Sequence, residues 1–255
     1  SRIRALLRRN QKDLTVSRSG ITLDKAKLQA SRDGEESHIA DSTILVTVNT
    51  YDGTVRLSSV LRDTLVDLPA YKTHKAGRNK FNMAYHLGNT WEGIEGAMAY
   101  TNLTMFHNFG VEVDYNVEVG FDAFTDVVNT MGGVDIELTA NEAYALGLGK
   151  AGIHHLDGET ALNYARTRSI DNDFNRTARQ RNVVSALINK CRSLSLSELN
   201  DLIRKVLPMV ITDMTNEEIT SCVLDIVPML LDLKIESSQI PVEGTYRFET
   251  LDIIG

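Results

Sequence analysis

The sequence has no long apolar run and little proline. No stretch approaches the roughly 18 consecutive apolar residues of a transmembrane helix, and no signal peptide is visible. Only four prolines occur in 255 residues, and no Ser/Gly-rich linker interrupts the chain. A chain of this length that is 42% hydrophobic can bury a sizeable core. These features favour one domain without a clear internal boundary.

Other absences exclude whole classes of site. The formal net charge is −7, and no basic stripe interleaved with aromatic residues is present, so nucleic-acid binding is not expected. No motif for a nucleophilic serine or cysteine occurs. His107, His154 and His155 lack the spacing of metal ligands and are expected to be structural.

One stretch of this acidic chain is cationic. Between Arg166 and Arg181 the sequence places five arginines and only two carboxylates, Asp171 and Asp173. A guanidinium group binds phosphate through two parallel hydrogen bonds and stays charged at any ordinary pH. Several of them converging on one pocket suggest a ligand with more than one phosphate. The spacing alone leaves open a structural network in which the two aspartates neutralise the arginines.

The same stretch predicts two helices. Asp157 is expected to cap a short helix that ends near Arg166, residues 169–174 are expected to form a loop, and a second helix is expected from about Asn175. At about 100° per residue, the core-facing side of that helix carries Arg176, Arg179, Gln180, Val183 and Leu187. Arg181 points away from this side and is interpreted as a surface residue.

The rest of the chain alternates strands with helices. A hairpin is expected from residues 43–49 and 55–60, which flank Tyr51-Asp52-Gly53. Residues 65–68 are expected to extend its edge. Further strands are expected at 115–119, 134–138, 238–240 and 246–251, helices at 81–87, 91–109, 121–131, 141–146, 197–209 and 216–231, and loops at 72–79 and 147–152. This pattern predicts an α/β fold of three layers, α/β/α, with a mixed central β-sheet flanked by helices.

Five blocks of the sequence resemble the LytR–CpsA–Psr family, extracellular enzymes of bacterial cell-envelope assembly. The arginine-rich block is LDGETALNYARTRSIDNDFNRTARQRNVVSAL (156–187). The other blocks, in the family's order, are ADSTILVTVN (40–49), LSSVLRDTLV (57–66), NKFNMAYHLG (79–88) and DYNVEVGFDAFTDVVNTMGGVDIEL (114–138). The resemblance covers residues 28 to 190 closely and the remainder loosely.

The resemblance implies a function and a location. Members of the family are phosphotransferases that move a glycopolymer, such as cell-wall teichoic acid or capsular polysaccharide, from a polyprenyl-diphosphate carrier onto peptidoglycan. The implied partners are the polyprenyl-diphosphate-linked glycan, peptidoglycan and the membrane, with no nucleic acid. The expected location is the extracellular face of a bacterial plasma membrane, reached through an N-terminal transmembrane anchor ahead of this sequence. Residues 1–27 would then be a basic segment after the anchor, and residues 28–255 a single catalytic domain.

The resemblance also implies site residues. Those expected to bind phosphate are Arg32, Arg62, Lys80, Arg166, Arg168, Arg176, Arg179 and Gln180. Asp173 is the preferred general base because it most closely precedes the arginine helix, with Asp171 as the alternative. Arg62 and Asp63 complete the expected catalytic set.

Magnesium is the implied cofactor, because a divalent cation would bridge phosphate oxygens and assist the leaving group. Asp41 matches one of the family's two metal-binding aspartates. Ala30 stands where the other is usual, which leaves Asp33 as the nearest carboxylate. This departure keeps open a second function, in which the protein binds polyprenyl diphosphate or envelope glycan without catalysing transfer. The extracellular location permits a disulfide between Cys191 and Cys222, which we expect in preference to two free thiols.

Overall fold

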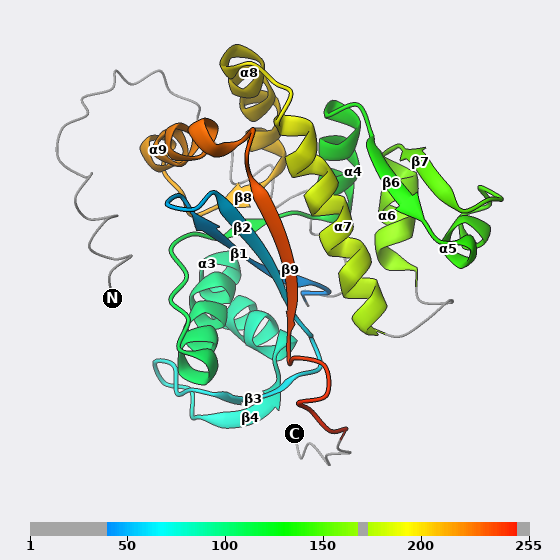
Figure 1. Cartoon of the computed structure of the whole chain (residues 1–255). Coiled ribbons are helices and arrows are strands. Elements are labelled where there is room, and N and C mark those ends of the chain that lie inside the picture. The colour runs from blue at the N-terminus through cyan, green and yellow to red at the C-terminus, as the bar shows by residue number, and fades with distance from the viewer. Residues whose placement is uncertain (1–39, 168–172, 249–255) are drawn as a thin grey trace.

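The computed structural model describes residues 40–167 and 173–248 of the chain (Figure 1). The basic segment 1–27 and the candidates Arg32 and Asp33 lie outside these residues. Within the described ranges, no helix combines the length and apolar character needed to cross a membrane.

A mixed three-stranded sheet forms the centre of the molecule. Its strands are β1 (Thr43–Asn49), β2 (Thr54–Val60) and β9 (Lys234–Ile240), in the order β1-β2-β9. The predicted hairpin is confirmed: β1 and β2 pair antiparallel, from Thr43 opposite Val60 to Asn49 opposite Thr54. β9 then pairs parallel to β2. β2 is therefore the middle strand, and both of its faces are covered.

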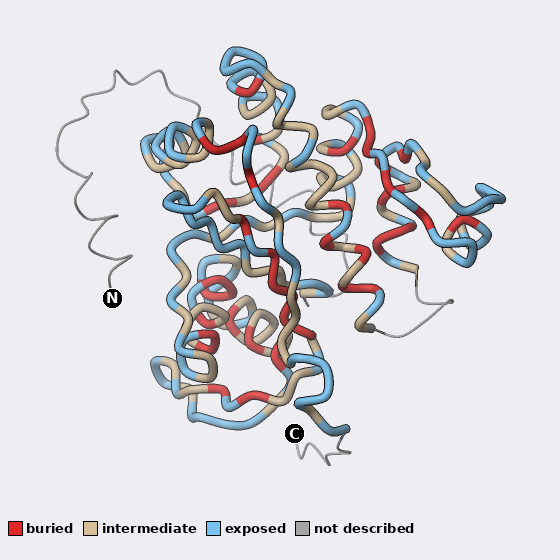
Figure 2. Tube along the Cα trace, in the orientation of Figure 1, coloured by how far each residue is buried: buried red, intermediate tan, exposed pale blue. Residues whose placement is uncertain are grey.

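Helices lie on both sides of the central sheet, and buried residues line its interior (Figures 1 and 2). Alternate residues of β2 point to opposite faces of the sheet. Val60 joins a cluster with Ala84 and Tyr100 of α3 (Asn82–Phe109). Leu57 packs on the other side, in a cluster that includes Val184 of α7 (Asp173–Cys191). The sheet is thus held between helices, which confirms the predicted three-layer α/β/α fold with a mixed sheet.

A second group of elements packs on the far side of α7. It consists of α4 (Phe121–Thr130), β6 (Val134–Leu138), α5 (Ala140–Ala145), β7 (Gly152–Leu156) and α6 (Gly158–Arg166). β6 and β7 form an antiparallel hairpin. Val134 and Leu156 of this hairpin share a fully buried cluster with Val183 of α7 and Val128 of α4. Helix α7 therefore lies between two apolar clusters, one on the sheet and one on this hairpin.

The remaining elements complete the chain. They are β3 (Leu65–Leu68), β4 (Gly77–Lys80), β5 (Val117–Glu118), α8 (Leu196–Val206), the 3₁₀ turn η1 (Leu207–Met209), β8 (Ile211–Thr212), α9 (Asn216–Ile226) and the 3₁₀ turn η2 (Val227–Met229). The predicted strands at 43–49, 65–68 and 134–138 agree with the structure in full. The predicted helices at 121–131, 141–146, 197–209 and 216–231 agree to within a few residues.

Several strand predictions were wrong. β3 does not extend the central sheet but pairs with β4, within the segment that was expected to be a loop. β7 was not predicted, β9 begins four residues before the expected strand, and residues 246–248 are not a strand. β4 and β9 are polar, with the sequences GRNK and KIESSQI, so pairing with a neighbouring strand rather than apolar periodicity determines them.

Helix α3 joins the helical segments expected at 81–87 and 91–109 and contains a break that was not predicted. Glu92 (φ −143°) and Gly93 (φ 65°) interrupt the helix and turn it into two arms. The arms touch at their glycines, because a Cβ atom at Gly88 would lie 2.3 Å from the carbonyl oxygen of Gly96. The Glu92–Gly93 break therefore folds the helix back on itself at a contact that only small residues permit.

The expected disulfide is also wrong, because Cys191 and Cys222 are both free thiols. Burial raises the pKa of each thiol, with nearby carboxylates as a further cause at Cys222. The prediction relied on the expected compartment, whereas a disulfide also requires the two Cα atoms to lie close together.

The contact between α6 and α4 gives a first prediction. A Cβ atom at Gly158 would lie 2.2 Å from the carbonyl oxygen of Thr125, which is too close for α6 to keep its position. We expect Gly158→Ala to lower the free energy of unfolding by about 1–3 kcal/mol through overpacking. Urea denaturation followed by circular dichroism measures the change.

Gly77→Ala is the matched control, because nothing lies within 4 Å of its added Cβ atom. It should change stability by no more than about 0.5 kcal/mol. Equal stability of the Gly158 and Gly77 variants would contradict the close α4–α6 contact.

Candidate anion-binding active site

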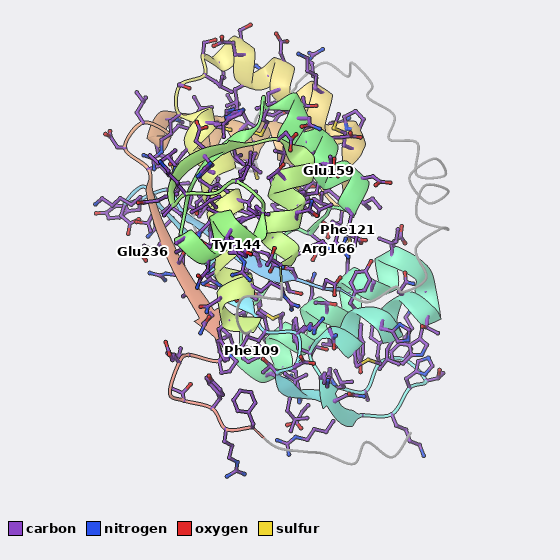
Figure 3. All side chains as sticks on the ribbon, turned by 90° about the vertical axis from the view of Figure 1, so that its right-hand side faces the viewer. Phe109, Phe121, Tyr144, Glu159, Arg166 and Glu236 are labelled. Atoms are coloured by element: carbon purple, nitrogen blue, oxygen red, sulfur yellow. The ribbon has the colours of Figure 1, made fainter. Side chains whose placement is uncertain are left out.

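Helix α6 carries the first arginine of the cationic stretch. Its beginning is fixed by Asp157, whose carboxylate accepts a hydrogen bond from the Thr160 backbone N–H at 2.9 Å, as predicted. Hydrogen bonds from the backbone and side chain of Thr160 lower the pKa of Asp157. Arg166 lies in the last turn, exposed, with its guanidinium carbon 4.1 Å from the ring centroid of Phe121 (Figure 3). This cation–π contact orients the exposed charge without neutralising it.

The arginines of α7 are buried. The helix begins at Asp173, two residues before the expected start, and Arg176 and Arg179 are only 3% and 2% exposed. Their predicted position on the core side is therefore confirmed. The interpretation of Arg181 as a surface residue was wrong, because it is 7% exposed. A single core-facing side was assumed, whereas α7 is covered on both sides, by the sheet and by the β6–β7 hairpin.

Arg179 connects three helices. Its Nη2 atom donates to the carbonyl oxygen of Thr167 at 2.6 Å, immediately after α6, and its Nη1 atom lies 3.7 Å from Oε1 of Glu142 in α5. Burial in low dielectric strengthens both contacts. Arg179 therefore fixes the end of α6, and with it the position of Arg166, whatever further ligand it binds.

Arg181 connects α7 to the central sheet. Its Nη1 atom donates to Oγ of Ser59 at 2.7 Å, and Ser59 is itself fully buried. Among the described residues no carboxylate pairs with Arg181, and its Nε atom has no hydrogen-bond partner. Burial lowers the pKa of Arg181 accordingly. The protein thus holds a cation in its core with one neutral hydrogen-bond partner.

A second group of charges lies at the end of the β1–β2 hairpin. The antiparallel register places Thr43 opposite Val60, and two further residues bring Asp41 opposite Arg62. Nη1 of Arg62 lies 3.4 Å from Oδ1 of Asp41, and its Nε lies 3.5 Å from Oδ2 of Asp63. The strand pairing therefore explains why residues 21 positions apart form one cluster.

Lys80, the last residue of β4, extends this cluster. Its Nζ atom lies 2.7 Å from Oδ1 of Asp63. Burial by itself raises the pKa of Asp63, but the hydrogen bond and charge of Lys80, followed by the charge of Arg62, outweigh it and lower the pKa overall. A carboxylate with a lowered pKa is a weak general base. Asp63 is therefore better suited to positioning Arg62 and Lys80 than to accepting a proton.

Two hydrogen bonds join this cluster to the arginine helices. Oγ of Ser42 donates to Oε1 of Gln180 at 2.7 Å, and Nε2 of Gln180 donates to the carbonyl oxygen of Ala165 at 3.5 Å. Gln180 therefore links the start of β1 to the end of α6, next to Arg166. Arg176 lies one helical turn before Gln180 on the same side of α7.

The structure thus brings together most of the predicted site residues that it describes. A continuous series of contacts runs through Lys80, Asp63, Arg62, Asp41, Ser42, Gln180 and Ala165. Arg168 and Asp171 lie outside the described residues, and Asp173 is placed only as the first residue of α7.

Sequence reasoning assigned no role to three residues that contact the site. Phe121 was only the first residue of a predicted helix, Ser42 lay in a block of the family resemblance, and Ser59 lay in a predicted strand. Each meets its partner across at least 45 positions of sequence, at Arg166, Gln180 and Arg181 respectively. No local periodicity carries that information.

The described carboxylates fit a magnesium site that takes only one ligand from the protein. Among the residues in the described ranges, no group of three or more His, Cys, Asp or Glu side chains could hold a metal. Magnesium, however, commonly binds one or two carboxylates and takes its other ligands from phosphate and water. The side chain of Asp41 is 49% exposed and has one oxygen turned toward Arg62. It fits a single-carboxylate site.

Comparisons with known proteins show what this chain is similar to. The model of the LytR_cpsA_psr family matches residues 9–253. The chain is 34% identical over 186 residues to the polyisoprenyl-teichoic acid–peptidoglycan teichoic acid transferase TagT of Bacillus subtilis (strain 168), a match that covers 70% of this chain and 50% of TagT. The chain therefore spans about half the length of this relative.

Solved structures of similar proteins share the fold. A structure of TagT bound to LIIa-WTA superposes with a TM-score of 0.62 at 30% identity, covering 79% of this chain and 73% of that one. The crystal structure of B. subtilis TagV gives a TM-score of 0.62 at 27% identity, covering 81% and 78%.

The Lys80–Asp63 pair gives a prediction for pH. We expect Lys80→Met to raise the pKa of Asp63, because the largest influence that lowers it is removed. The stabilisation from this pair is present above the ordinary carboxyl pKa of 3.8 and is lost as the pH falls through the lowered value. The stability difference between wild type and variant should therefore shrink in acid. Carboxyl ¹³C NMR titration measures the pKa directly.

Lys75→Met is the control, because it removes an exposed lysine that has no ion pair with a described residue. It should leave the titration of Asp63 unchanged. An unchanged pKa of Asp63 in Lys80→Met would refute the electrostatic link.

The buried Arg181–Ser59 contact gives a prediction for stability. Ser59→Ala removes the hydrogen-bond partner of a buried cation, so we expect a loss of about 1–3 kcal/mol. Arg181→Met removes the charge itself and keeps an apolar chain of similar length, so its effect should be small or stabilising. Equilibrium urea unfolding compares the two.

Ser58→Ala is the matched control on the opposite face of β2, where Oγ of Ser58 meets the neutral Oγ of Ser238 at 2.6 Å. Ser58→Ala should lower the free energy of unfolding by less than Ser59→Ala does. A Ser58 variant as unstable as the Ser59 variant would argue against a buried unpaired charge at Arg181.

Proposed function

Because this chain belongs to the LytR–CpsA–Psr family, we propose that it transfers a glycopolymer from a polyprenyl-diphosphate carrier onto peptidoglycan. Wall teichoic acid is the favoured glycopolymer, since the relatives named above act on it, and capsular polysaccharide is the alternative. The observation that carries the proposal is the series of contacts that joins Lys80, Arg62 and Asp41 to the arginine helices.

The transfer is a substitution at phosphorus. A peptidoglycan hydroxyl attacks the phosphorus that bears the sugar, the bond to the bridging oxygen breaks, and polyprenyl phosphate leaves. The glycan is thereby joined to peptidoglycan as a glycosyl phosphate. Charge spreads over the phosphoryl oxygens in the transition state, so fixed positive charge and positioning supply most of the catalysis.

The arginines have distinct roles in this proposal. Arg166 is exposed and has no carboxylate partner among the described residues, so its guanidinium is available to a diphosphate. Arg62 and Lys80 supply positive charge from the hairpin side. Arg176 and Arg179 supply positive charge from α7, and the neutral amide of Gln180 supplies a hydrogen bond. Arg32 and Arg168 are proposed to contribute from outside the described ranges.

A base and a cation complete the site. We assign the general base to Asp173, with Asp171 as the alternative, because both precede or begin the arginine helix. Magnesium would be held by Asp41, with Asp33 as the second candidate, and would stabilise negative charge on the phosphate oxygens. The reaction would take place at the extracellular face of the plasma membrane, where an N-terminal anchor would hold the domain near its lipid-linked donor.

Binding of a short prenyl diphosphate tests the site. We expect Arg166→Ala to weaken farnesyl diphosphate binding about 10- to 100-fold, since a charge-assisted contact is worth about 1.5–3 kcal/mol. Asp41→Asn should remove the effect of magnesium and keep binding in its absence. Isothermal titration calorimetry with and without Mg²⁺ measures both effects.

Arg204→Ala, an exposed arginine at the end of α8, is the matched control and should bind like wild type. Equal losses in Arg166→Ala and Arg204→Ala would mean that only net charge matters. An Asp41→Asn protein with the full magnesium response would remove Asp41 from the metal site.

Product analysis separates transfer from capture. A polyprenyl-diphosphate-linked disaccharide is incubated with peptidoglycan, and the products are identified by mass spectrometry. Glycan joined to peptidoglycan supports the transferase. Bound but unchanged donor indicates a protein that only captures the lipid-linked glycan, and free sugar phosphate indicates a hydrolase.

A further inference from the structure

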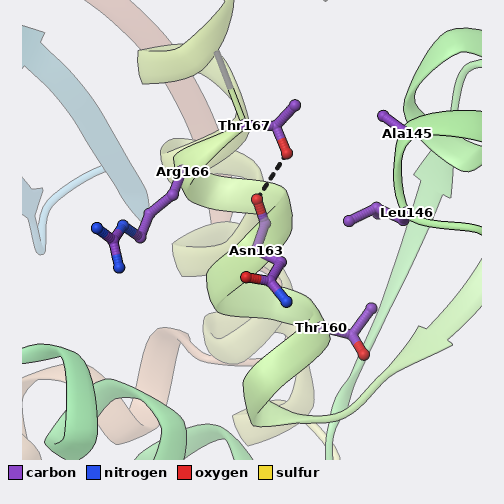
Figure 4. Close-up of a pocket in the computed structure, with 6 residues that line it drawn as sticks. All are labelled: Ala145, Leu146, Thr160, Asn163, Arg166 and Thr167. Atoms are coloured by element: carbon purple, nitrogen blue, oxygen red, sulfur yellow. Dashed lines mark hydrogen bonds between the residues drawn. The ribbon is translucent and has the colours of Figure 1, made fainter. Parts of the chain in front are cut away.

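An open pocket lies beside the last turns of α6. Its volume is about 460 Å³, and it is lined by Ala145, Leu146, Thr160, Asn163, Arg166 and Thr167 (Figure 4). Pockets that bind small ligands typically measure about 300–1,000 Å³. We propose that this pocket binds a sugar ring of the glycan, an inference that rests on the proposed function.

The two walls of the pocket differ in chemistry. Thr160, Asn163 and Thr167 are spaced three and four residues apart, so they lie along one side of α6. Ala145 and Leu146, at the end of α5, form the facing apolar wall. A sugar ring has hydroxyl groups around its rim and C–H groups on its faces. An amide and hydroxyls on one side with apolar carbons on the other match that pattern.

Asn163 is the lining residue best placed to hydrogen-bond with the ligand. The hydroxyl of Thr167 already donates to the carbonyl oxygen of Asn163 at 2.7 Å, and the hydroxyl of Thr160 is engaged with Asp157. The side-chain amide of Asn163 is exposed and has no hydrogen-bond partner among the described residues. It offers two donors and an acceptor, which suits a pair of neighbouring hydroxyls or an acetamido group.

The charge of the lining favours an uncharged ring. None of the lining residues carries a carboxylate, and Arg166 supplies the one cation. Figure 4 shows that Arg166 leaves α6 on the side away from Ala145 and Leu146. A polyanionic chain would therefore find little counter-charge in the pocket.

The position of the pocket connects it to the reaction. Arg166 is one of the residues that line the pocket, and its side chain leaves α6 on the side opposite Ala145 and Leu146 (Figure 4). A diphosphate bound at Arg166 would therefore lie near a sugar in the pocket. That ring belongs either to the donor glycan or to the acceptor strand. Both sources offer the same chemistry.

Three probes distinguish the sources. Saturation-transfer NMR and calorimetry are carried out with an N-acetylglucosamine tetramer as the acceptor-type glycan and with UDP-N-acetylglucosamine as the donor-type sugar diphosphate. UDP alone supplies the diphosphate without the sugar. We expect Asn163→Ala to weaken the binding of one of the two sugar probes about fivefold or more, which is the effect of losing one hydrogen bond. The affinity for UDP should change by no more than about twofold.

A steric variant and a control make the test independent of one substitution. Ala145→Trp, at an exposed position, should fill the pocket and reduce binding of the same sugar probe. Asn189→Ala removes an exposed amide near the end of α7 and should have no effect. If the variants bind the tetramer more weakly, the pocket belongs to the acceptor. If they bind UDP-N-acetylglucosamine more weakly but UDP as before, the pocket belongs to the donor.

Two results would overturn the inference. One is the absence of binding by either sugar probe. The other is sugar binding that is unaffected by both Asn163→Ala and Ala145→Trp. Failure of the proposed function is a separate outcome, because it appears as loss of farnesyl diphosphate and UDP binding by the wild-type chain while sugar binding persists.

Discussion

The burial of positive charge on α7 is the constraint on which the rest of the structure depends. The helix lies between the central sheet and the β6–β7 hairpin, so Arg176, Arg179 and Arg181 are all nearly inaccessible to water. A buried charge is unfavourable unless it is paired or hydrogen-bonded. Two of the compensating groups, the Thr167 carbonyl and the Ser59 hydroxyl, come from neighbouring elements. The arginines therefore fix where α6 and β2 lie relative to α7.

Whereas α7 carries buried charges, the pairing of β1 with β2 brings charged residues together at the surface. The antiparallel register of β1 and β2 brings Asp41 opposite Arg62. Lys80, the last residue of β4, contacts Asp63. These contacts are partly exposed and individually weak. Their value is geometric, because they place cations and carboxylates at the end of β1, where Ser42 meets Gln180. The sheet positions one half of the site and α7 the other.

Prediction from sequence succeeded where local chemistry determines structure. The β1–β2 hairpin follows from alternating apolar residues around a glycine turn, and α6 from the Asp157 cap. Prediction failed where contact with a distant segment of the chain determines the structure. β9 is polar and becomes a strand by pairing with β2, and Arg181 is buried because α7 has two covered sides. The five ordered blocks identified the family, and they singled out residues that the structure brings together, such as Asp41 and Arg62.

Within the hairpin half of the site, one ion pair links the carboxylate expected to bind metal to an arginine expected to bind phosphate. In the free protein Asp41 and Arg62 partly neutralise each other across 3.4 Å, and Asp63 shares Arg62 with Lys80. A cation bound by Asp41 would compete with Arg62 for that carboxylate and weaken this ion pair. A phosphate bound by Arg62 would in turn weaken the hold of Arg62 on Asp41. Because such coupling is reciprocal, metal and diphosphate should each strengthen the binding of the other. The Asp41–Arg62 ion pair would thus make the binding of metal and the binding of diphosphate depend on each other.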